Sequence, residues 1–121
     1  MRVVRGGVSV TTVVNIRDLR TGWEHDSRYI YCGRAGHGLD GRYGNRHVIG
    51  WCGVCGTRHR RADAIAAHRF ETDTRYVNDA SFRTEVDAMR DHFLVCFCFP
   101  RPCHCDNYAR LADYGPSGFW A

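Results

Sequence analysis

The arrangement of apolar residues predicts three strands, of which one is central. Residues 8–16 are dense in valine and threonine, which favour strands, and residues 28–32 form a shorter run of the same kind. Residues 93–99 are apolar at every position and are followed by Pro100 and Pro102. A run without alternation is typical of a strand that is covered on both faces. We therefore predict that 93–99 is the central strand of a sheet.

Three later segments have the spacing of amphipathic helices: 61–70, 79–90 and 104–114. In the first, one face collects the apolar side chains and is predicted to be buried: Ala62, Ile65, Ala66 and Phe70. In the second, a stripe of three apolar residues follows the cap at Asn78 or Asp79: Phe82, Val86 and Met89. Because strands and helices alternate late in the chain, the predicted class is α/β. We expect a small Rossmann-like three-layer domain with a short mixed or parallel sheet.

Length and composition predict a single domain that functions inside a cell. With 121 residues the chain is expected to be a single domain, 1–121. No apolar run approaches the ~20 residues that span a bilayer, and no signal peptide follows the N-terminal arginines. The expected location is cytoplasmic, without a membrane partner. The seven cysteines are then reduced thiols or metal ligands.

The net charge of +4 comes with an unusual choice of basic residue, because all 17 cations are arginine. The planar guanidinium group forms paired contacts with phosphate and carboxylate. This composition favours an anionic partner, and equally fits a solvated face of scattered arginines.

Side chains that can bind metal or take part in a reaction are most concentrated between Cys96 and Asp106, where four Cys, one His and one Asp occur within eleven residues. Cys96 and Cys98 should share one face of the strand, with Phe97 and Phe99 in the core on the other face. A Pro-Arg-Pro turn then leads to three residues at a helix start, where thiol pKa values are lowered: Cys103, His104 and Cys105.

Three interpretations of this cluster stay open. The cysteines can be small buried core residues. They can bind Zn²⁺ through Cys96, Cys98, Cys103 and His104. They can also serve a reaction, in which Cys103 or a metal-bound water is the nucleophile and His104 and Asp106 exchange protons.

A second pair of thiols, Cys52 and Cys55, follows Trp51 in a pentapeptide one residue away from that of thioredoxin. Gly56 interrupts the helix that a thioredoxin-like site requires, so a redox role is disfavoured. We expect a structural zinc site of Cys52, Cys55 and His59. His68, another cysteine or water would be the fourth ligand.

A glycine-rich loop precedes this pair and has two interpretations. Its five glycines, at positions 33, 36, 38, 41 and 44, interleave with Arg34, Arg42 and Arg46. Glycine lets backbone amides approach an anion, and arginine contacts phosphate. The loop can equally be a plain surface loop.

The segment Leu94 to Asp106 resembles the signature of the domain-of-unknown-function family numbered 4326: Cys-aromatic-Cys, a proline turn, then Cys-His and an acidic residue. The resemblance extends over about residues 10–114, through Val14-Asn15-Ile16-Arg17, Tyr31-Cys32-Gly33-Arg34, Gly44-Asn45 and Arg61 to Ile65. Such domains occur in bacteria and phages. The resemblance implies a fold and a site, but no reaction. It favours a ligand-binding role for four loop positions, with Asn15 and Arg17 nearby: Gly33, Arg34, Gly44 and Asn45.

Two functions follow as hypotheses. The first is a phage or bacterial domain, in the host cytoplasm if phage-encoded, that binds a nucleotide-like anionic ligand beside a Cys/His metal or thiol site. The second is a non-catalytic, zinc-stabilised module that binds nucleic acid or a host protein through arginine. The first predicts that Arg17 and Arg34 converge on one cleft. The second predicts an exposed patch of Arg58, Arg60, Arg61 and Arg69.

Overall fold

The centre of the protein is a parallel sheet of three strands. The computed structural model describes residues 4–5, 8–36 and 38–116. The strands are β3 (Thr12–Asn15), β4 (Tyr29–Tyr31) and β7 (Phe93–Cys96), in the order β3-β7-β4. Strand β7 pairs in parallel with both neighbours. The predicted α/β class and the central position of this strand are confirmed.

Strand β7 is shorter than the apolar run that predicted it. Its last residue is Cys96, and the side-chain amide of Asn15 then donates to the carbonyls of Phe97 (3.1 Å) and Phe99 (2.8 Å). These bonds hold the chain in a turn before the cis peptide bond between Phe99 and Pro100. Phe97 and Phe99 are 48% and 43% exposed, so their predicted place in the core is wrong. The apolar run 93–99 therefore extends past the end of the strand.

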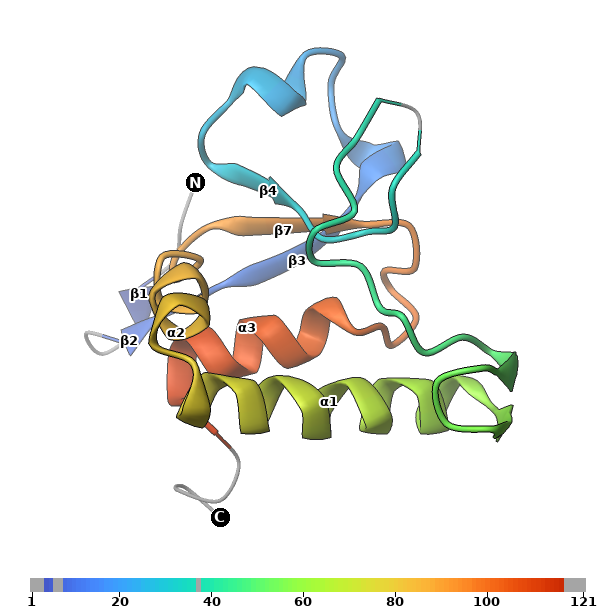
Figure 1. Cartoon of the computed structure of the whole chain (residues 1–121). Coiled ribbons are helices and arrows are strands. Elements are labelled where there is room, and N and C mark those ends of the chain that lie inside the picture. The colour runs from blue at the N-terminus through green and yellow to red at the C-terminus, as the bar shows by residue number, and fades with distance from the viewer. Residues whose placement is uncertain (1–3, 6–7, 37, 117–121) are drawn as a thin grey trace.

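Three helices cover one face of the sheet (Figure 1): α1 (Arg61–Asn78), α2 (Ala80–Asp87) and α3 (Cys105–Tyr114). Helix α3 packs directly on β3 and β7, and both α1 and α2 contact α3. The core lies between sheet and helices, and its largest fully buried side chains are those of Met89, Leu94 and Leu111. All three helices were predicted, although α1 is longer than expected.

The buried face of α1 differs from the predicted one. Ala64, His68 and Thr72 are buried, whereas Phe70 is 75% exposed. Most polar groups of this face are hydrogen-bonded: Thr72 Oγ1 donates to the His68 carbonyl (2.9 Å), and Asn107 Nδ2 donates to His68 Nδ1 (3.0 Å). Among the described residues, His68 Nε2 has no such partner. Buried polar groups with partners cost little, so a polar stripe can face the core.

The opposite face of the sheet is covered by a loop and aromatic side chains. The loop contains two 3-10 turns, η1 (Ile16–Asp18) and η2 (Trp23–His25), and η2 contacts β4. Tyr29 stacks on Phe93 with ring centroids 5.1 Å apart, and Trp23 contacts Tyr31. The third layer of the predicted three-layer arrangement is therefore this loop rather than a set of helices.

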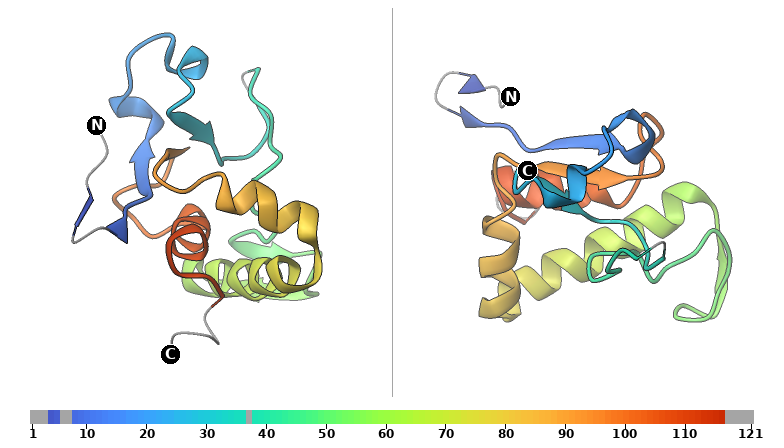
Figure 2. Two further views of the ribbon diagram at one scale, coloured as in Figure 1. Left: turned by 90° about the vertical axis from the view of Figure 1, so that its left-hand side faces the viewer. Right: turned by 90° about the horizontal axis from the view of Figure 1, so that it is seen from above.

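Two hairpins lie outside the main sheet (Figure 2). One pairs β1 (Val4–Arg5) with β2 (Val8–Ser9), so the predicted strand 8–16 is divided into β2 and β3. The other pairs β5 (Gly50–Cys52) with β6 (Thr57–His59) and leads directly into α1. Among the described residues, no helix has the length and hydropathy needed to cross a membrane.

Candidate metal centres and the cleft between them

The β5–β6 hairpin brings Cys52 and Cys55 together in a tight turn. The turn ends at Gly56, whose φ of 68° lies in the left-handed region that glycine adopts without strain. The Gly56 amide donates to the Cys52 carbonyl at 2.8 Å and closes the turn. Gly56, which interrupts the helix that a thioredoxin-like site would need, thus closes the turn of this hairpin.

Four side chains of the hairpin region converge on one point: His47, Cys52, Cys55 and His59. One potential ligand atom from each lies within 4.8 Å of the others. His47 Nδ1 is 3.6 Å from Cys52 Sγ and 3.3 Å from Cys55 Sγ. A tetrahedral zinc ion with its usual Zn–S and Zn–N bonds keeps its ligand atoms about 3.3–3.8 Å apart. The group therefore has the composition and spacing of a metal site.

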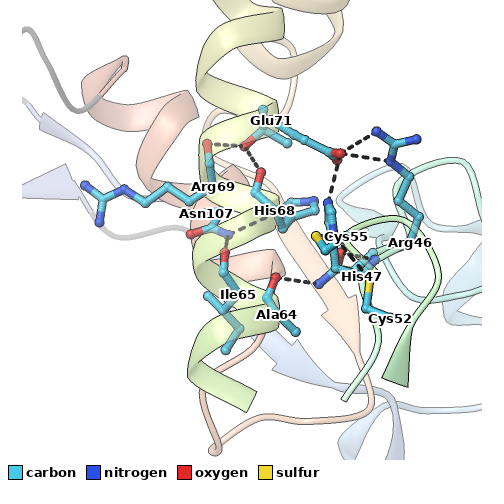
Figure 3. Close-up of polar contacts among 12 residues, drawn as sticks. Arg46, His47, Cys52, Cys55, Ala64, Ile65, His68, Arg69, Glu71 and Asn107 are labelled. Atoms are coloured by element: carbon cyan, nitrogen blue, oxygen red, sulfur yellow. Dashed lines mark hydrogen bonds and ion pairs between the residues drawn. The ribbon is translucent and has the colours of Figure 1, made fainter. Parts of the chain in front are cut away.

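His47 is oriented by contacts on its outer side (Figure 3). Its ring is buried, and Nε2 lies 2.8 Å from Glu71 Oε2. Arg46 Nε donates to the same carboxylate oxygen at 2.9 Å. A carboxylate on one ring nitrogen of a histidine leaves the other nitrogen free to coordinate, and this pairing is usual for metal-bound histidine.

Electrostatics at the hairpin favour a deprotonated thiol and an ionised Glu71. Desolvation raises the pKa of Cys52, but backbone hydrogen bonds from Cys55, Val48 and Val54 and a bond from His47 outweigh it and lower the pKa to about 6. Burial likewise opposes ionisation of Glu71, yet Arg46 and His47 lower its pKa. The thiolate is the form that binds metal.

His59 also has a ring nitrogen that lacks a partner. Its Nε2 is buried, and within the described part of the chain no hydrogen-bond partner meets it. A buried polar atom without a partner is costly, and coordination to an ion would remove that cost. The position of His59 in the group of four therefore supports a metal site.

His68, the fourth ligand suggested by the sequence, lies elsewhere. It is on α1, faces Asn107, and contacts the rings of His104 and Tyr108 at 5.1 and 4.9 Å. His47 is in the group instead. It precedes Cys52 by five residues, outside the segment that the zinc interpretation considered. The signal that could have found it is the full spacing His-x₄-Cys-x₂-Cys-x₃-His.

A second group of thiols lies where β7 ends and α3 begins: Cys96, Cys103 and Cys105. All three are buried, and their sulfur atoms lie within 4.8 Å of one another. Cys103 Sγ donates to Cys96 Sγ at 3.4 Å. Hydrogen bonds from Cys103 and Cys105 lower the pKa of Cys96, while desolvation raises that of Cys105. At Cys103 the hydrogen bond with Cys105 lowers the pKa, but the bond to Cys96 and desolvation raise it to about 12. The predicted lowering of thiol pKa values at the helix start is therefore wrong for Cys103 and Cys105.

Other residues of the predicted cluster have different surroundings. Cys98 is half-buried and lies outside the group of three thiols. His104 Nε2 contacts the Cys32 carbonyl, and desolvation lowers the His104 pKa. Asp106 Oδ2 accepts the backbone N–H of Cys103 at 3.1 Å, which is a helix-capping contact. These contacts give His104 and Asp106 structural partners.

A cleft of about 540 Å³ lies beside the group of three thiols, at the carboxyl ends of β4 and β7, and Val48 and Ile49, which precede the β5–β6 hairpin, form part of its wall. Residues from the glycine-rich loop, the approach to the hairpin, α1 and the strand end line it, including Gly33, Arg34, Ile49, Arg61, Cys96 and His104. Open parallel sheets bind ligands at this edge.

The predicted ligand-binding residues divide into two kinds. Asn15 and Asn45 are buried and are used inside the protein, because the Asn45 amide donates to the Ala64 carbonyl (3.2 Å) and its oxygen accepts the His47 N–H (2.8 Å). Arg17 is exposed and does not line the cleft, so the predicted convergence of Arg17 and Arg34 on one cleft is wrong. Gly33 and Arg34 do line it.

Two glycines of the loop motif lie in close contact with nearby parts of the chain. A Cβ at Gly33 would overlap the Tyr31 hydroxyl, and one at Gly44 would lie 3.0 Å from the Gly33 carbonyl oxygen. Both glycines therefore let the loop fold against itself. The motif at these positions shapes the loop that carries Arg34.

Arg34 connects the cleft with the hairpin. Its Nε donates to the Asn45 carbonyl at 3.1 Å, and its Nη2 donates to the His47 carbonyl at 3.2 Å. The backbone on either side of Arg46 is thus fixed by a side chain that lines the cleft.

The comparison with family models identifies the class of this domain. The model described as "Domain of unknown function (DUF4326)" matches residues 14–114, so the chain belongs to that family. No curated protein and no solved structure matches the chain.

Proposed function

We propose that this protein is a zinc-stabilised binding domain. Zn²⁺ at His47, Cys52, Cys55 and His59 would fix the β5–β6 hairpin, and the adjoining cleft would bind a small nucleotide-like anion. The observation that carries the proposal is the position of His47, with one ring nitrogen toward both sulfurs and the other on Glu71.

Two thiolates and two imidazoles are a donor set that Zn²⁺ prefers, and four protein ligands are typical of structural sites. The hairpin also has little apolar burial of its own, since Trp51 and Val54 are 61% and 48% exposed. In such a segment the metal supplies folding energy that a core would otherwise provide. Free thiols of this kind are kept in reducing compartments, which supports the cytoplasm as the location.

The cleft has the size and surroundings of a small-molecule site. Its volume lies within the range of about 300–1,000 Å³ that ligand pockets have. Arg34 and Arg61 line it, together with the apolar side chains of Val48, Ile49 and Ile65. Guanidinium groups contact phosphate, and apolar walls suit a flat base or another ring. These features support an anionic ligand with an apolar part.

The metal site and the cleft are connected through shared residues. Val48 and Ile49 form part of the cleft wall and lie between His47 and β5. Arg34 bonds to the His47 carbonyl from the cleft side. Loss of the metal should therefore disorder one wall and weaken ligand binding.

The test combines metal content with nucleotide binding. Protein prepared without chelator is analysed for zinc, and AMP and ADP are titrated by calorimetry. We expect Cys52→Ser with Cys55→Ser to lose one equivalent of zinc. We expect Arg61→Gln to weaken nucleotide binding about tenfold, as loss of one charge-assisted contact implies.

Arg58→Gln is the matched control, because Arg58 is an exposed arginine of β6 that does not line the cleft. Unchanged zinc content in the double cysteine variant would contradict the metal site. Equal loss of binding in Arg58→Gln and Arg61→Gln would contradict the cleft as the anion site.

The positions of the arginines give less support to a nucleic-acid module. Arg61 lines the cleft and donates to the Pro102 carbonyl, rather than joining a patch with its neighbours. Arg60 Nε lies 3.5 Å from Asp63, and Arg69 Nε lies 4.0 Å from Asp73. Two of the four arginines are thus neutralised locally.

A further inference from the structure

We propose a second metal site at the end of β7, in which Cys96, Cys103 and Cys105 bind a thiophilic divalent cation such as Zn²⁺. Its fourth coordination position faces the cleft and takes an exchangeable ligand. This site is independent of the hairpin site, and it does not require that the hairpin bind zinc.

The spacing of the sulfur atoms already suits one ion. Cys96 Sγ and Cys103 Sγ are 3.4 Å apart, and all three sulfurs lie within 4.8 Å of one another. Sulfur ligands at the usual Zn–S length are about 3.8 Å apart in a tetrahedral site. Small side-chain rotations would therefore bring the three sulfurs to that separation.

The backbone around Cys96 resembles that around Cys52 of the hairpin. Backbone hydrogen bonds from Cys98 and Phe99, two and three residues later, reach the Cys96 sulfur. At the hairpin, Cys52 receives the same bonds from Val54 and Cys55, again two and three residues later. Amide N–H groups that donate to sulfur stabilise the thiolate.

The charge of three thiolates has compensation nearby. Cys105 is the first residue of the ten-residue helix α3, and Cys103 lies just before it. The N-terminus of a helix carries partial positive charge, which favours anions. Arg34 and Arg61 line the adjoining cleft and add two cations.

The protein leaves the fourth position open on the cleft side. His104 Nε2 lies 3.8 Å from Cys105 Sγ but contacts the Cys32 carbonyl, and the Cys32 thiol hydrogen-bonds with Cys105. Neither His104 nor Cys32 belongs to the group of three. Cys96 and Cys103 line the cleft, whereas Cys105 does not. An ion held by these three would therefore meet the cleft on the side of Cys96 and Cys103.

Three protein ligands and one exchangeable position are typical of zinc ions that act on a substrate. A ligand in the cleft would then contact the ion as well as Arg34 and Arg61. The hairpin site, with four protein ligands, offers no such position. The hairpin site thus has a structural role, whereas the ion at the end of β7 would contact the ligand in the cleft.

The experiment uses the full chain with Cys52→Ser and Cys55→Ser, which removes both thiols of the hairpin site and keeps Cys96, Cys103 and Cys105. Circular dichroism checks that this variant is folded, because Cys52 is buried. Co²⁺ alone is titrated and followed by absorption. We expect one equivalent to bind with the strong sulfur-to-cobalt charge-transfer bands of a thiolate-rich site. X-ray absorption of the zinc form should give three sulfur neighbours and one oxygen or nitrogen.

In the same background, Cys103→Ser should abolish Co²⁺ binding, whereas Cys98→Ser should leave it unchanged, because Cys98 also lines the cleft but lies outside the group. Cyanide added to the cobalt protein should shift its visible spectrum. As a second measurement that needs no variant, wild-type protein should bind two equivalents of Zn²⁺.

Three results would overturn the proposal. The first is one equivalent of Zn²⁺ in wild-type protein together with none in the hairpin variant. The second is four sulfur neighbours, which would mean that a further cysteine such as Cys32 closes the site. The third is a cobalt spectrum that cyanide does not change.

Discussion

The hairpin and the end of β7 both present cysteines whose sulfur accepts amide N–H bonds from the second and third residues that follow. Their surroundings differ. On the hairpin Cys52 is fully buried but lies outside the main hydrophobic cluster, and Cys55 is exposed. Cys96, Cys103 and Cys105 all belong to that cluster and are at most 2% exposed. The hairpin group has two histidines, and the other group consists of sulfur alone.

This comparison separates two reasons for a cysteine cluster. On the hairpin, few apolar contacts hold the chain, so the cluster itself has to supply stability through a ligand. At the end of β7 the hydrophobic core already holds the cysteines in place, so a metal there is free to serve a ligand in the cleft. Four experiments test the comparison, from the largest expected effect to the smallest.

The largest effect should come from zinc on the stability of the whole protein. At a free zinc concentration about 1,000-fold above the dissociation constant, one site adds about 4 kcal/mol to the free energy of unfolding. Urea unfolding with zinc and with a chelator measures this difference. We expect Cys52→Ser to remove the contribution of the hairpin site and to leave that of the group at the end of β7. If the zinc-dependent difference in Cys52→Ser equals that of wild-type protein, the hairpin is not a stabilising site.

Glu71 should influence the hairpin site without touching the metal. Glu71→Gln removes the charge beside His47 Nε2, and loss of such an outer contact lowers metal affinity about 10- to 100-fold. A competition titration with a chromophoric chelator measures the change. Glu85→Gln is the control, because Glu85 contacts Tyr43 and Arg42 instead. Equal effects of both variants would contradict the assignment.

In metal-free protein, serine in place of cysteine should distinguish the two groups. Cys105→Ser places a hydroxyl in a fully buried position and should lower the free energy of unfolding by about 1–3 kcal/mol. Cys55→Ser is at an exposed position and should change it by less than about 0.5 kcal/mol. Urea unfolding in chelator measures both. Similar losses would mean that the hairpin is part of the core.

The smallest effect should be a pH dependence of the free energy of unfolding that arises from the buried His68. Burial lowers the pKa of His68 from 6.5 to about 3, so below pH 6.5 the unfolded chain binds a proton that the folded protein excludes. Stability should therefore fall by about 1 kcal/mol through this residue between pH 6.5 and 5.5, and the slope approaches about 1.4 kcal/mol per pH unit below that range. His68→Gln should reduce that slope in metal-free protein. The exposed His25→Gln should leave it unchanged.

Several features could be predicted from the sequence because they depend on residues that are close together along the chain. The central position of β7 follows from its apolar run. The approximate starts of α1 and α3 follow from local sequence patterns. The pair Cys52 and Cys55 with His59 also follows from spacing. The buried face of α1 could not be predicted in the same way, because the partner of the buried His68 is Asn107, which is distant in the chain.

The sequence by itself determined the α/β class, the family and the two segments that carry cysteines. Only the tertiary structure decided how each group is completed. His47 joins the hairpin site because Glu71, on α1, orients its ring, and Cys105 rather than Cys98 joins Cys96 because α3 begins against the end of β7. Strand and helix propensities act over a few residues, whereas coordination depends on distances between atoms from separate elements. Those distances are set by how the helices pack on the sheet.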